Sequence, residues 1–267
     1  MKKRILLTGD DGHTSIGTRL LVHFLRKDFD LTIAGTMTQQ SGVGGFISAR
    51  DGGRYEETEI DGIPALLVDG HPVDAIELAK SWYPKPFDLV VSGINWGTNI
   101  GAAFISSGTM AAAMRSLSLG LAPKSIAISW LLTEGKWHED HDGTEDISRY
   151  LVYPGEIAHR VIHMSIKNNL WGNMMLNINL PEKISDRVRF TKFLPDITDF
   201  YRYPMTIDRK KKRFAYSTGL SKHLERGIQY DSGAILSGYI SITPCTRDIT
   251  NNMVYKHFAR KTFTLDP

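Results

Sequence analysis

The sequence predicts an α/β protein with a mostly parallel central sheet and a β-rich C-terminal elaboration. Short, continuous apolar segments at 4–8, 87–92 and 125–130 are typical of strands that are buried on both faces. Segments with helical spacing of apolar residues separate them, so strands and helices alternate through the first 130 residues. This alternation is typical of parallel sheets built from right-handed crossovers.

The chain opens with a strand at 4–8, a helix at 15–27 and a strand at 31–34, and Thr14 or Ser15 is the expected cap of the helix. The next segment, 54–68, contains two extended runs joined by Asp61-Gly62. Such a dipeptide between extended runs predicts a two-residue β-hairpin. Further helices are expected at 72–82 and 108–119.

Beyond residue 130 the pattern is less regular. We expect a helix at 156–167, strands at 173–179 and 239–243, and a long extended hairpin at 199–217. The dense basic run Arg209 to Arg213 is then a solvated hairpin tip or, alternatively, a patch that faces phosphate. We expect a single domain that spans residues 1–267. Within it, residues 1–130 form the strand–helix core, and residues from about 195 to 267 form a C-terminal hairpin and oligomerisation elaboration.

Composition narrows the class of protein. The 267 residues are 42% hydrophobic with a net charge of only +3, so a sizeable core is possible and no nucleic-acid partner is indicated. Cys245 is the only cysteine, which excludes an internal disulfide and a cysteine-based metal site. Neither a signal peptide nor a membrane span is apparent, and we expect a cytoplasmic protein.

Asp10-Asp11-Gly12 directly follows the first predicted strand. In open α/β sheets, ligands bind beyond the carboxyl ends of the strands. Two adjacent carboxylates repel each other, and a hard divalent cation relieves that repulsion. The alternative is an ordinary turn in which one aspartate caps the next helix.

The segment 92–101 has glycines at every fourth position, with Asn95 and Asn99 midway between them. Glycine lets the backbone approach a ligand closely, and asparagine offers a neutral carbonyl oxygen. An irregular surface loop is the alternative. Ser106 to Thr109 precedes an Ala-rich helix, where free amides and hydroxyls either cradle a phosphate or simply cap the helix. No GxGxxG follows the first strand and no GxxxxGK[ST] is present, which argues against dinucleotide and P-loop chemistry.

Two other polar segments are weaker candidates. Residues 39–45 follow the second strand, and Ser41 could supply a hydroxyl ligand, although a flexible loop is the preferred interpretation of this segment taken alone. Residues 138–142 (HEDHD) look metal-like, but their spacing is not that of a helical HExxH motif and a polar loop is preferred.

Seven segments, taken in order, match one family pattern: 5–12, 40–44, 70–74, 88–101, 107–113, 177–181 and 238–244. Together they resemble the SurE family, the "survival protein E" nucleotidases. The most specific part is DLVVSGINWGTNIG at 88–101 combined with SGT at 107–109.

The resemblance implies a Rossmann-like, three-layer core and one divalent cation per subunit, Mg²⁺ or Mn²⁺. By motif position, the implied metal ligands are Asp10, Asp11, Ser41 and Asn95. The implied phosphate-binding residues are Asn99, Ser107, Gly108 and Thr109. The resemblance also implies hydrolysis of nucleoside monophosphates (5′-nucleotidase type), with Asp10 or Asp11 orienting or deprotonating the water. Homodimers or homotetramers, formed through C-terminal extensions, are expected.

Some positions depart from the family pattern. The chain has Ala102-Ala103 for an acidic pair, Ser106 for Tyr, Arg115-Ser116 for Glu, Gly9 for Asn, and Gly45 for His. These departures leave a second hypothesis open, a nucleotide- or phosphate-binding regulator that has lost turnover. A dinucleotide-dependent oxidoreductase lacks its glycine fingerprint here.

Overall fold

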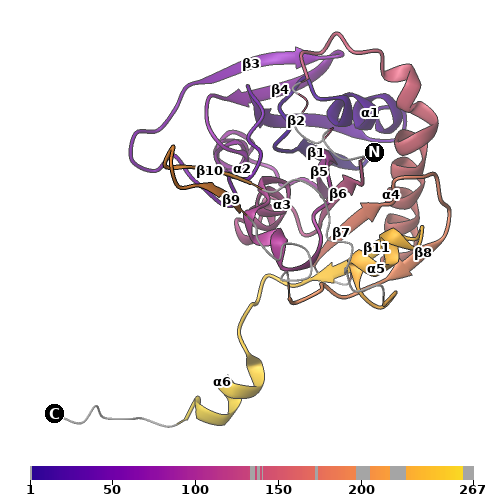
Figure 1. Cartoon of the computed structure of the whole chain (residues 1–267). Coiled ribbons are helices and arrows are strands. Elements are labelled where there is room, and N and C mark those ends of the chain that lie inside the picture. Colours follow the sequence, from indigo (N-terminus) through magenta and orange to yellow (C-terminus); the bar gives the residue numbers. More distant parts are fainter. Residues whose placement is uncertain are drawn as a thin grey trace.

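The computed structural model describes residues 2–132, 136, 139, 141–171, 174–196, 205–216 and 227–260. Within these ranges, nine strands form one mostly parallel sheet, and two further strands form a separate hairpin (Figure 1). From one edge of the sheet to the other, the strands are β3 (Tyr55–Ile60), β4 (Ile63–Val68), β2 (Asp30–Thr36), β1 (Arg4–Thr8), β5 (Leu89–Trp96), β6 (Ser125–Trp130), β7 (Met175–Leu180), β11 (Ile240–Cys245) and β8 (Val188–Phe190).

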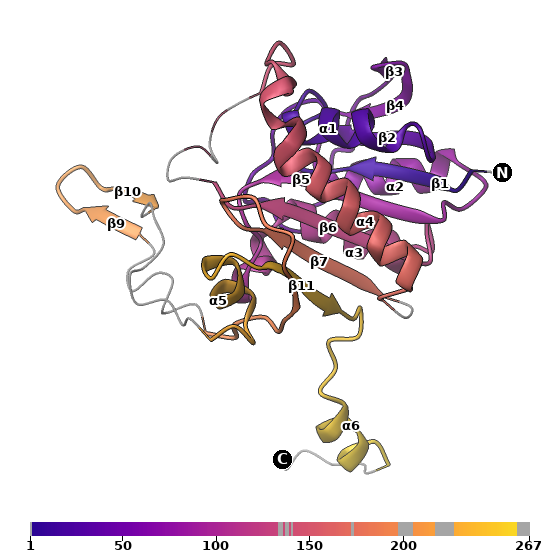
Figure 2. The same ribbon diagram turned by 90° about the vertical axis from the view of Figure 1, so that its right-hand side faces the viewer.

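Helices cover both faces of the sheet and make three layers (Figures 1 and 2). The helices are α1 (Ile16–Leu25) and α4 (Ile157–Asn168) on one face, and α2 (Pro72–Trp82) and α3 (Gly108–Ser118) on the other. Ile5 and Leu7 of β1 belong to the apolar cluster that includes α1 and α4, whereas Leu6 packs with α2 and α3. Successive strand residues point to opposite faces, so a fully apolar strand supplies both halves of the core.

β1 and β5 are the topological switch point of the sheet. The chain leaves β1 for β2 on one side and later returns through β5 on the other side of β1. The loops that follow these two parallel strands therefore diverge at the same sheet edge. Open α/β proteins bind their ligands in the crevice that this divergence creates.

The predicted fold class is confirmed. Two strands and one helix have the predicted bounds, namely β1, β6 and α2. The β3–β4 hairpin turns at Asp61 and Gly62, with φ values of 51° and 75°, as a type I′ turn requires. The basic run joins β9 (Met205–Asp208) to β10 (Arg213–Tyr216), although residues 199–204 and 217 of the predicted hairpin lie outside the described residues.

The Gly/Asn segment differs from the prediction in one respect. It does not begin as a loop at Ser92, because β5 continues to Trp96. The register against β6 shifts between Ser92 and Asn95, and pairing resumes with Asn95 opposite Ser129. The irregularity that the glycines signalled is thus accommodated inside the strand as a bulge.

Several short elements were not predicted: β8, α5 (Asp231–Leu236), α6 (Asn252–Phe258), the 3-10 turns Gly101–Ser106 and Ile147–Tyr150, and the π-type turn Leu151–Glu156. Each is too short to show a period in sequence. No described helix is long and apolar enough to cross a membrane.

Asp231, the first residue of α5, ties the C-terminal part to the loop after β5. Its side chain is fully buried and accepts hydrogen bonds from the backbone amides of Gly101 (2.8 Å), Leu194 (3.2 Å) and Ser232 (2.8 Å). Burial raises the pKa of this carboxyl group, and the three amides oppose that rise.

Asp231→Ala should lower the free energy of unfolding by about 3 kcal/mol, because it leaves buried amides without their acceptor. Urea unfolding followed by circular dichroism measures this change. The control is Asp51→Ala, which removes an exposed aspartate paired only with exposed Arg50 and should change stability little. Equal effects of the two variants would contradict a tethering role for Asp231.

Candidate metal and phosphate site

Two adjacent aspartates are buried at the switch point. Asp10 and Asp11 follow β1 directly and are only 5% and 7% exposed. Asn95, from the bulged part of β5, shares a narrow crevice with them. The residues that line this crevice are Gly9, Asp10, Asp11, Ser15, Thr18, Gly93, Ile94 and Asn95. Residues from the segment after β1, from the start of α1 and from β5 thus meet at one point.

The Asp10 carboxylate faces the N-terminus of α3. Oδ1 accepts a hydrogen bond from the Thr109 hydroxyl, and the Gly108 and Thr109 amides also hydrogen-bond this carboxylate. Burial raises the pKa of Asp10, and these donors oppose the rise. The first amides of a helix carry partial positive charge and favour an anion. This helix end therefore already holds one anionic group of the chain itself.

Gly108 is required by this contact. A Cβ atom at position 108 would lie 2.8 Å from both Cβ and Oδ2 of Asp10. No side chain fits without moving the aspartate. The neighbouring Ser107 caps α3, because its Oγ accepts a hydrogen bond from the Met110 amide at 3.1 Å. The segment 106–109 thus caps the helix and also presents its amides to a carboxylate, whereas its role as a phosphate cradle stays a prediction.

The pKa of Asp11 is raised as well. Desolvation raises its pKa, and the negative charge of Asp10 raises it further. The Trp96 amide donates to Asp11 Oδ2 at 2.6 Å, and the side chain of Gln39 also hydrogen-bonds the carboxylate; both oppose the rise. Two buried carboxylates side by side hold one negative charge more easily than two, unless a cation joins them.

The loop after β2 reaches the same place. The Gln40 amide donates to the backbone carbonyl of Asp10 at 2.6 Å, and the Gly44 amide donates to the carbonyl of Ser106 at 3.0 Å. This loop therefore spans from Asp10 to the segment before α3. Ser41 lies between these two anchors, with its hydroxyl accepting from Gln39 Nε2 at 3.0 Å. Ser41 is exposed and does not line the crevice in this structure.

Asn99 lies in a buried polar network beyond the crevice. Its Nδ2 donates to Ser129 Oγ at 2.9 Å, and its backbone amide donates to Asn179 Oδ1 at 2.9 Å. The side chains of Asn177 and Asn179 donate to the Asn99 carbonyl. The network fixes the backbone of the Gly/Asn loop against β6 and β7. Asn99 therefore has a structural role in holding this loop, and a phosphate-binding role for Asn99 stays a prediction.

Of the departures from the family pattern, Arg115 has a direct structural explanation. Its guanidinium forms an ion pair with Glu77 of α2, with Nε 2.8 Å from Oε1. The acid in this contact thus comes from α2, and the pair joins α2 to α3. Ala102 lies in the 3-10 turn, where its amide donates to the Leu194 carbonyl. Ser106 is exposed and donates to the Ala103 carbonyl.

The HEDHD segment is only partly described, since His138 and Asp140 lie outside the described residues. The ring of His141 packs edge-on against Trp96, and its Nδ1 accepts from the Ile16 amide at 3.3 Å. His141 thus supports the start of α1. Of the described residues, only Asp28, His159 and His163 form a group of three potential metal-binding side chains from His, Cys, Asp and Glu.

Sequence reasoning missed the residues that support the site. Ser129 and Asp231 had no motif that marked them. Gln39 and Trp96 lie in the candidate segments 39–45 and 92–101, but nothing in those segments marked them as partners of Asp11. Asn177 and Asn179 gave a usable signal, because asparagines at alternate positions of an otherwise apolar strand must find buried partners. The pattern indicates that both side chains lie on the same face of the strand, but it does not identify Asn99 as the residue that they contact.

The raised pKa values predict a specific pH dependence of stability. The folded state holds a proton on the Asp10–Asp11 pair more tightly than the unfolded state, in which the aspartate pKa is near 3.8. Stability of the metal-free protein should therefore fall as the pH rises above about 4, by up to ~1.4 kcal/mol per pH unit until the raised pKa is passed. Asp11→Asn should flatten this fall, because it removes one ionisation and keeps an acceptor for the Trp96 amide.

Urea unfolding in a chelator between pH 5 and pH 8 measures the slope for both proteins. Asp231 contributes in the same direction, so the quantity that counts is the difference between wild type and variant. Asp51→Asn serves as control. Identical slopes for wild type and Asp11→Asn would refute the electrostatic account of the pair.

Comparison with known proteins identifies the family of the chain. The family model described as "Survival protein SurE" matches residues 5–199. The chain is 33% identical to the 5′-nucleotidase SurE of Methanopyrus kandleri, with 94% of each chain covered. It is 32% identical to that of Deinococcus radiodurans, over 93% of this chain and 89% of the relative. The crystal structure of the SurE protein from Aquifex aeolicus superposes with a TM-score of 0.73 at 26% identity, covering 96% of this chain and 98% of that one. The chain belongs to the SurE family.

Proposed function

We propose that this protein is a divalent-metal-dependent phosphomonoesterase that hydrolyses nucleoside monophosphates, as a 5′-nucleotidase. The observation that carries the proposal is the buried Asp10–Asp11 pair, which lies at the switch point against the N-terminus of α3. The names of the relatives, 5′-nucleotidase SurE, support the reaction class.

The donor set suits a hard cation such as Mg²⁺ or Mn²⁺, which prefers oxygen ligands. Asp10 and Asp11 supply carboxylates. Burial disfavours a negative charge on both of them at once, and a bound cation would balance the second charge. Asn95 Nδ2 donates to the Gly97 carbonyl at 2.7 Å, so the carboxamide oxygen is the atom we assign to the cation. Ser41 is the fourth proposed ligand, supported by the anchoring of its loop to the Asp10 carbonyl.

When bound, the cation would neutralise phosphate oxygens and lower the pKa of a water molecule. The chain itself supplies the anion-binding groups: the Gly108 and Thr109 amides and the Thr109 hydroxyl already face a carboxylate. We assign phosphate oxygens to this helix end, where fixed donors stabilise charge that shifts in the transition state. Ser107 holds the first turn of α3 in place, and the second Nδ2 hydrogen of Asn99 is proposed to reach the phosphate.

Asp10→Asn should reduce phosphate release from a nucleoside monophosphate by about 100-fold or more. The variant keeps an acceptor for Thr109 but loses the charge that holds the cation. A phosphate-release assay with Mg²⁺, with Mn²⁺ and with chelator measures the loss, and thermal unfolding verifies that the variant folds. Asp51→Asn, at an exposed position, should leave the rate unchanged.

Full turnover by Asp10→Asn would refute the assignment of this residue. A wild-type protein that binds nucleotide tightly but releases no phosphate with any cation would refute the enzymatic proposal. That second result would instead identify a nucleotide-binding regulator.

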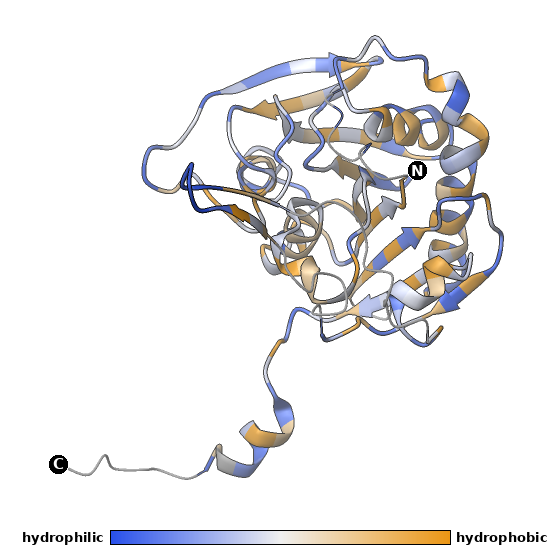
Figure 3. Cartoon of the chain, in the orientation of Figure 1, coloured by the Kyte–Doolittle hydropathy of each residue, from blue (hydrophilic) through white to orange (hydrophobic). Residues whose placement is uncertain are grey.

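We also propose that the protein is a homo-oligomer, a dimer or a tetramer, that assembles through its C-terminal part. Met205, Ile207, Phe214 and Tyr216 pair across the β9–β10 hairpin and lie on one face of it. All four are exposed, three of them by 67–69%. The hairpin and α6 lie away from the sheet (Figure 2), and apolar residues on both are coloured orange in Figure 3. A contiguous exposed apolar face of this kind is typical of a protein–protein interface.

Ile207→Glu combined with Phe214→Glu should shift the apparent mass in light scattering toward that of a single 29.9 kDa chain, because two charges would be buried in the interface. The matched control, Thr206→Glu combined with Ala215→Glu, changes the cross-strand pair on the opposite face of the same hairpin. If both double variants keep the mass of the wild type, the hairpin is not the interface.

A further inference from the structure

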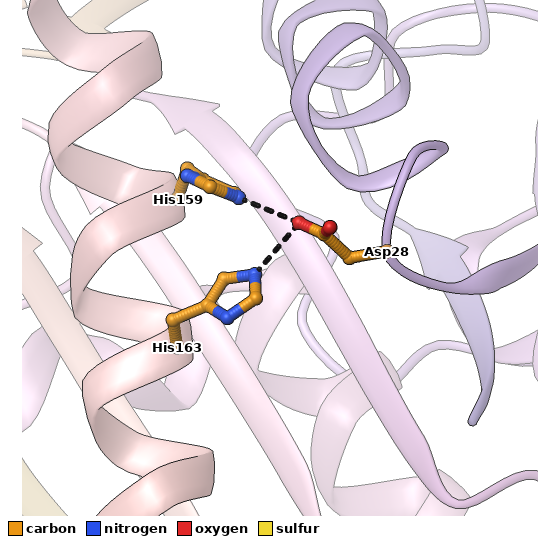
Figure 4. Close-up of side chains that lie close together, drawn as sticks. All are labelled: Asp28, His159 and His163. Atoms are coloured by element: carbon orange, nitrogen blue, oxygen red, sulfur yellow. Dashed lines mark hydrogen bonds and ion pairs between the residues drawn. The ribbon is translucent and has the colours of Figure 1, made fainter. Parts of the chain in front are cut away.

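A cluster of three metal-binding side chains lies where α4 passes the end of α1, outside the crevice described above. His159 and His163 are four residues apart on α4, so both lie on the same face of the helix. Asp28 follows α1, and its position is fixed by a hydrogen bond from its amide to the Leu25 carbonyl at 3.0 Å. Figure 4 shows the two rings and the carboxylate pointing toward one another.

The distances are close to those of a metal site. Nε2 of His159 and Nε2 of His163 each lie 3.1 Å from the same atom, Asp28 Oδ2. The potential ligand atoms all lie within 4.8 Å of one another. In a tetrahedral zinc site with bonds of about 2.0–2.1 Å, neighbouring ligand atoms are ~3.3 Å apart. The two nitrogen–oxygen distances of 3.1 Å need to grow only slightly to reach that value.

Aromatic neighbours orient both imidazole rings. Phe24 stacks on His159 with ring centroids 5.6 Å apart, and Phe29 packs against His163 at 5.2 Å. Phe29 is buried in the main core, which gives its ring a fixed place. Ligands whose orientation is fixed by packing lose less freedom when they bind a metal.

The cluster is also accessible. The side chains of His159, His163 and Asp28 are 26%, 41% and 42% exposed. An ion can therefore enter from solvent, and water can occupy the coordination positions that the protein does not fill. Three protein ligands with an open position are sufficient for Zn²⁺.

We propose that Asp28, His159 and His163 bind a divalent transition-metal ion, Zn²⁺ in the first instance, and that this ion clamps α4 to the end of α1. Imidazole nitrogen favours Zn²⁺, Cu²⁺, Ni²⁺ or Co²⁺ over Mg²⁺. The oxygen donors at Asp10 and Asp11 have the opposite preference. The two sites therefore differ in metal class as well as in position.

The test uses the full chain without a polyhistidine tag, stripped with chelator and titrated with Zn²⁺ by isothermal calorimetry in excess Mg²⁺. We expect binding at the cluster that survives Asp10→Asn. His163→Gln and Asp28→Asn should each weaken it at least tenfold, whereas His23→Gln, at an exposed histidine of α1, should not. Co²⁺ should give a visible absorption band that His163→Gln removes.

Three results would overturn the proposal. The first is the absence of a Zn²⁺ site under these conditions. The second is Zn²⁺ binding that Asp10→Asn abolishes. The third is affinity that neither cluster variant changes, which would make the cluster an ion pair only. Should His163→Gln fail to fold, Asp28→Asn at an exposed turn decides the matter alone.

Discussion

The contact between the Asp10 carboxylate and the N-terminus of α3 is the constraint on which the site depends. It places a buried anion from the end of β1 against the first amides of a helix that follows β5. Gly108 is required because any Cβ there would collide with Asp10. The same contact orients α3, whose apolar residues complete one face of the core. Packing of the sheet and construction of the site are thus one arrangement, since the helix cannot shift without losing the partners of the carboxylate.

Burial gives this arrangement its chemical character. Asp11, with little exposed surface and Asp10 beside it, resists carrying a charge at the pH where an exposed aspartate is fully ionised. A cation and an added proton are alternative ways to relieve that repulsion, so metal affinity and protonation should compete at this pair. The helix N-terminus offsets part of the repulsion from the other side. The helix N-terminus alone does not offset the charge of two carboxylates. A doubly charged phosphate is therefore favoured at this site only when a cation is also present.

Much of this could be predicted from sequence, and the limit has a physical cause. The continuous apolar runs predicted the first and last residues of β1 and β6 correctly, because a strand that is buried on both faces is apolar along its whole length. Asp10, Asp11 and the segment 106–109 could be assigned to one sheet edge, since parallel strands align their carboxyl ends. Ser41 and Asn99 show what local pattern omits: one lies exposed beside its anchor, and the other is held in a network with Ser129 and two asparagines of β7. Such tertiary partners lie thirty or more positions away or depend on side-chain direction, and local spacing encodes neither.

The distribution of donor types argues that the two candidate metal sites favour different classes of metal ion. Asp10 and Asp11 present carboxylate oxygen in a crevice where two negative charges are adjacent, so charge density governs which ion binds. His159 and His163 present nitrogen on an accessible helix face with one carboxylate, so ligand softness governs the choice. A transition-metal ion could still bind the carboxylate pair, because the affinity order of divalent metal ions is much the same at different ligand sets. An imidazole cluster nearer the surface of the same chain would then compete with the carboxylate pair for that ion while leaving Mg²⁺ unaffected.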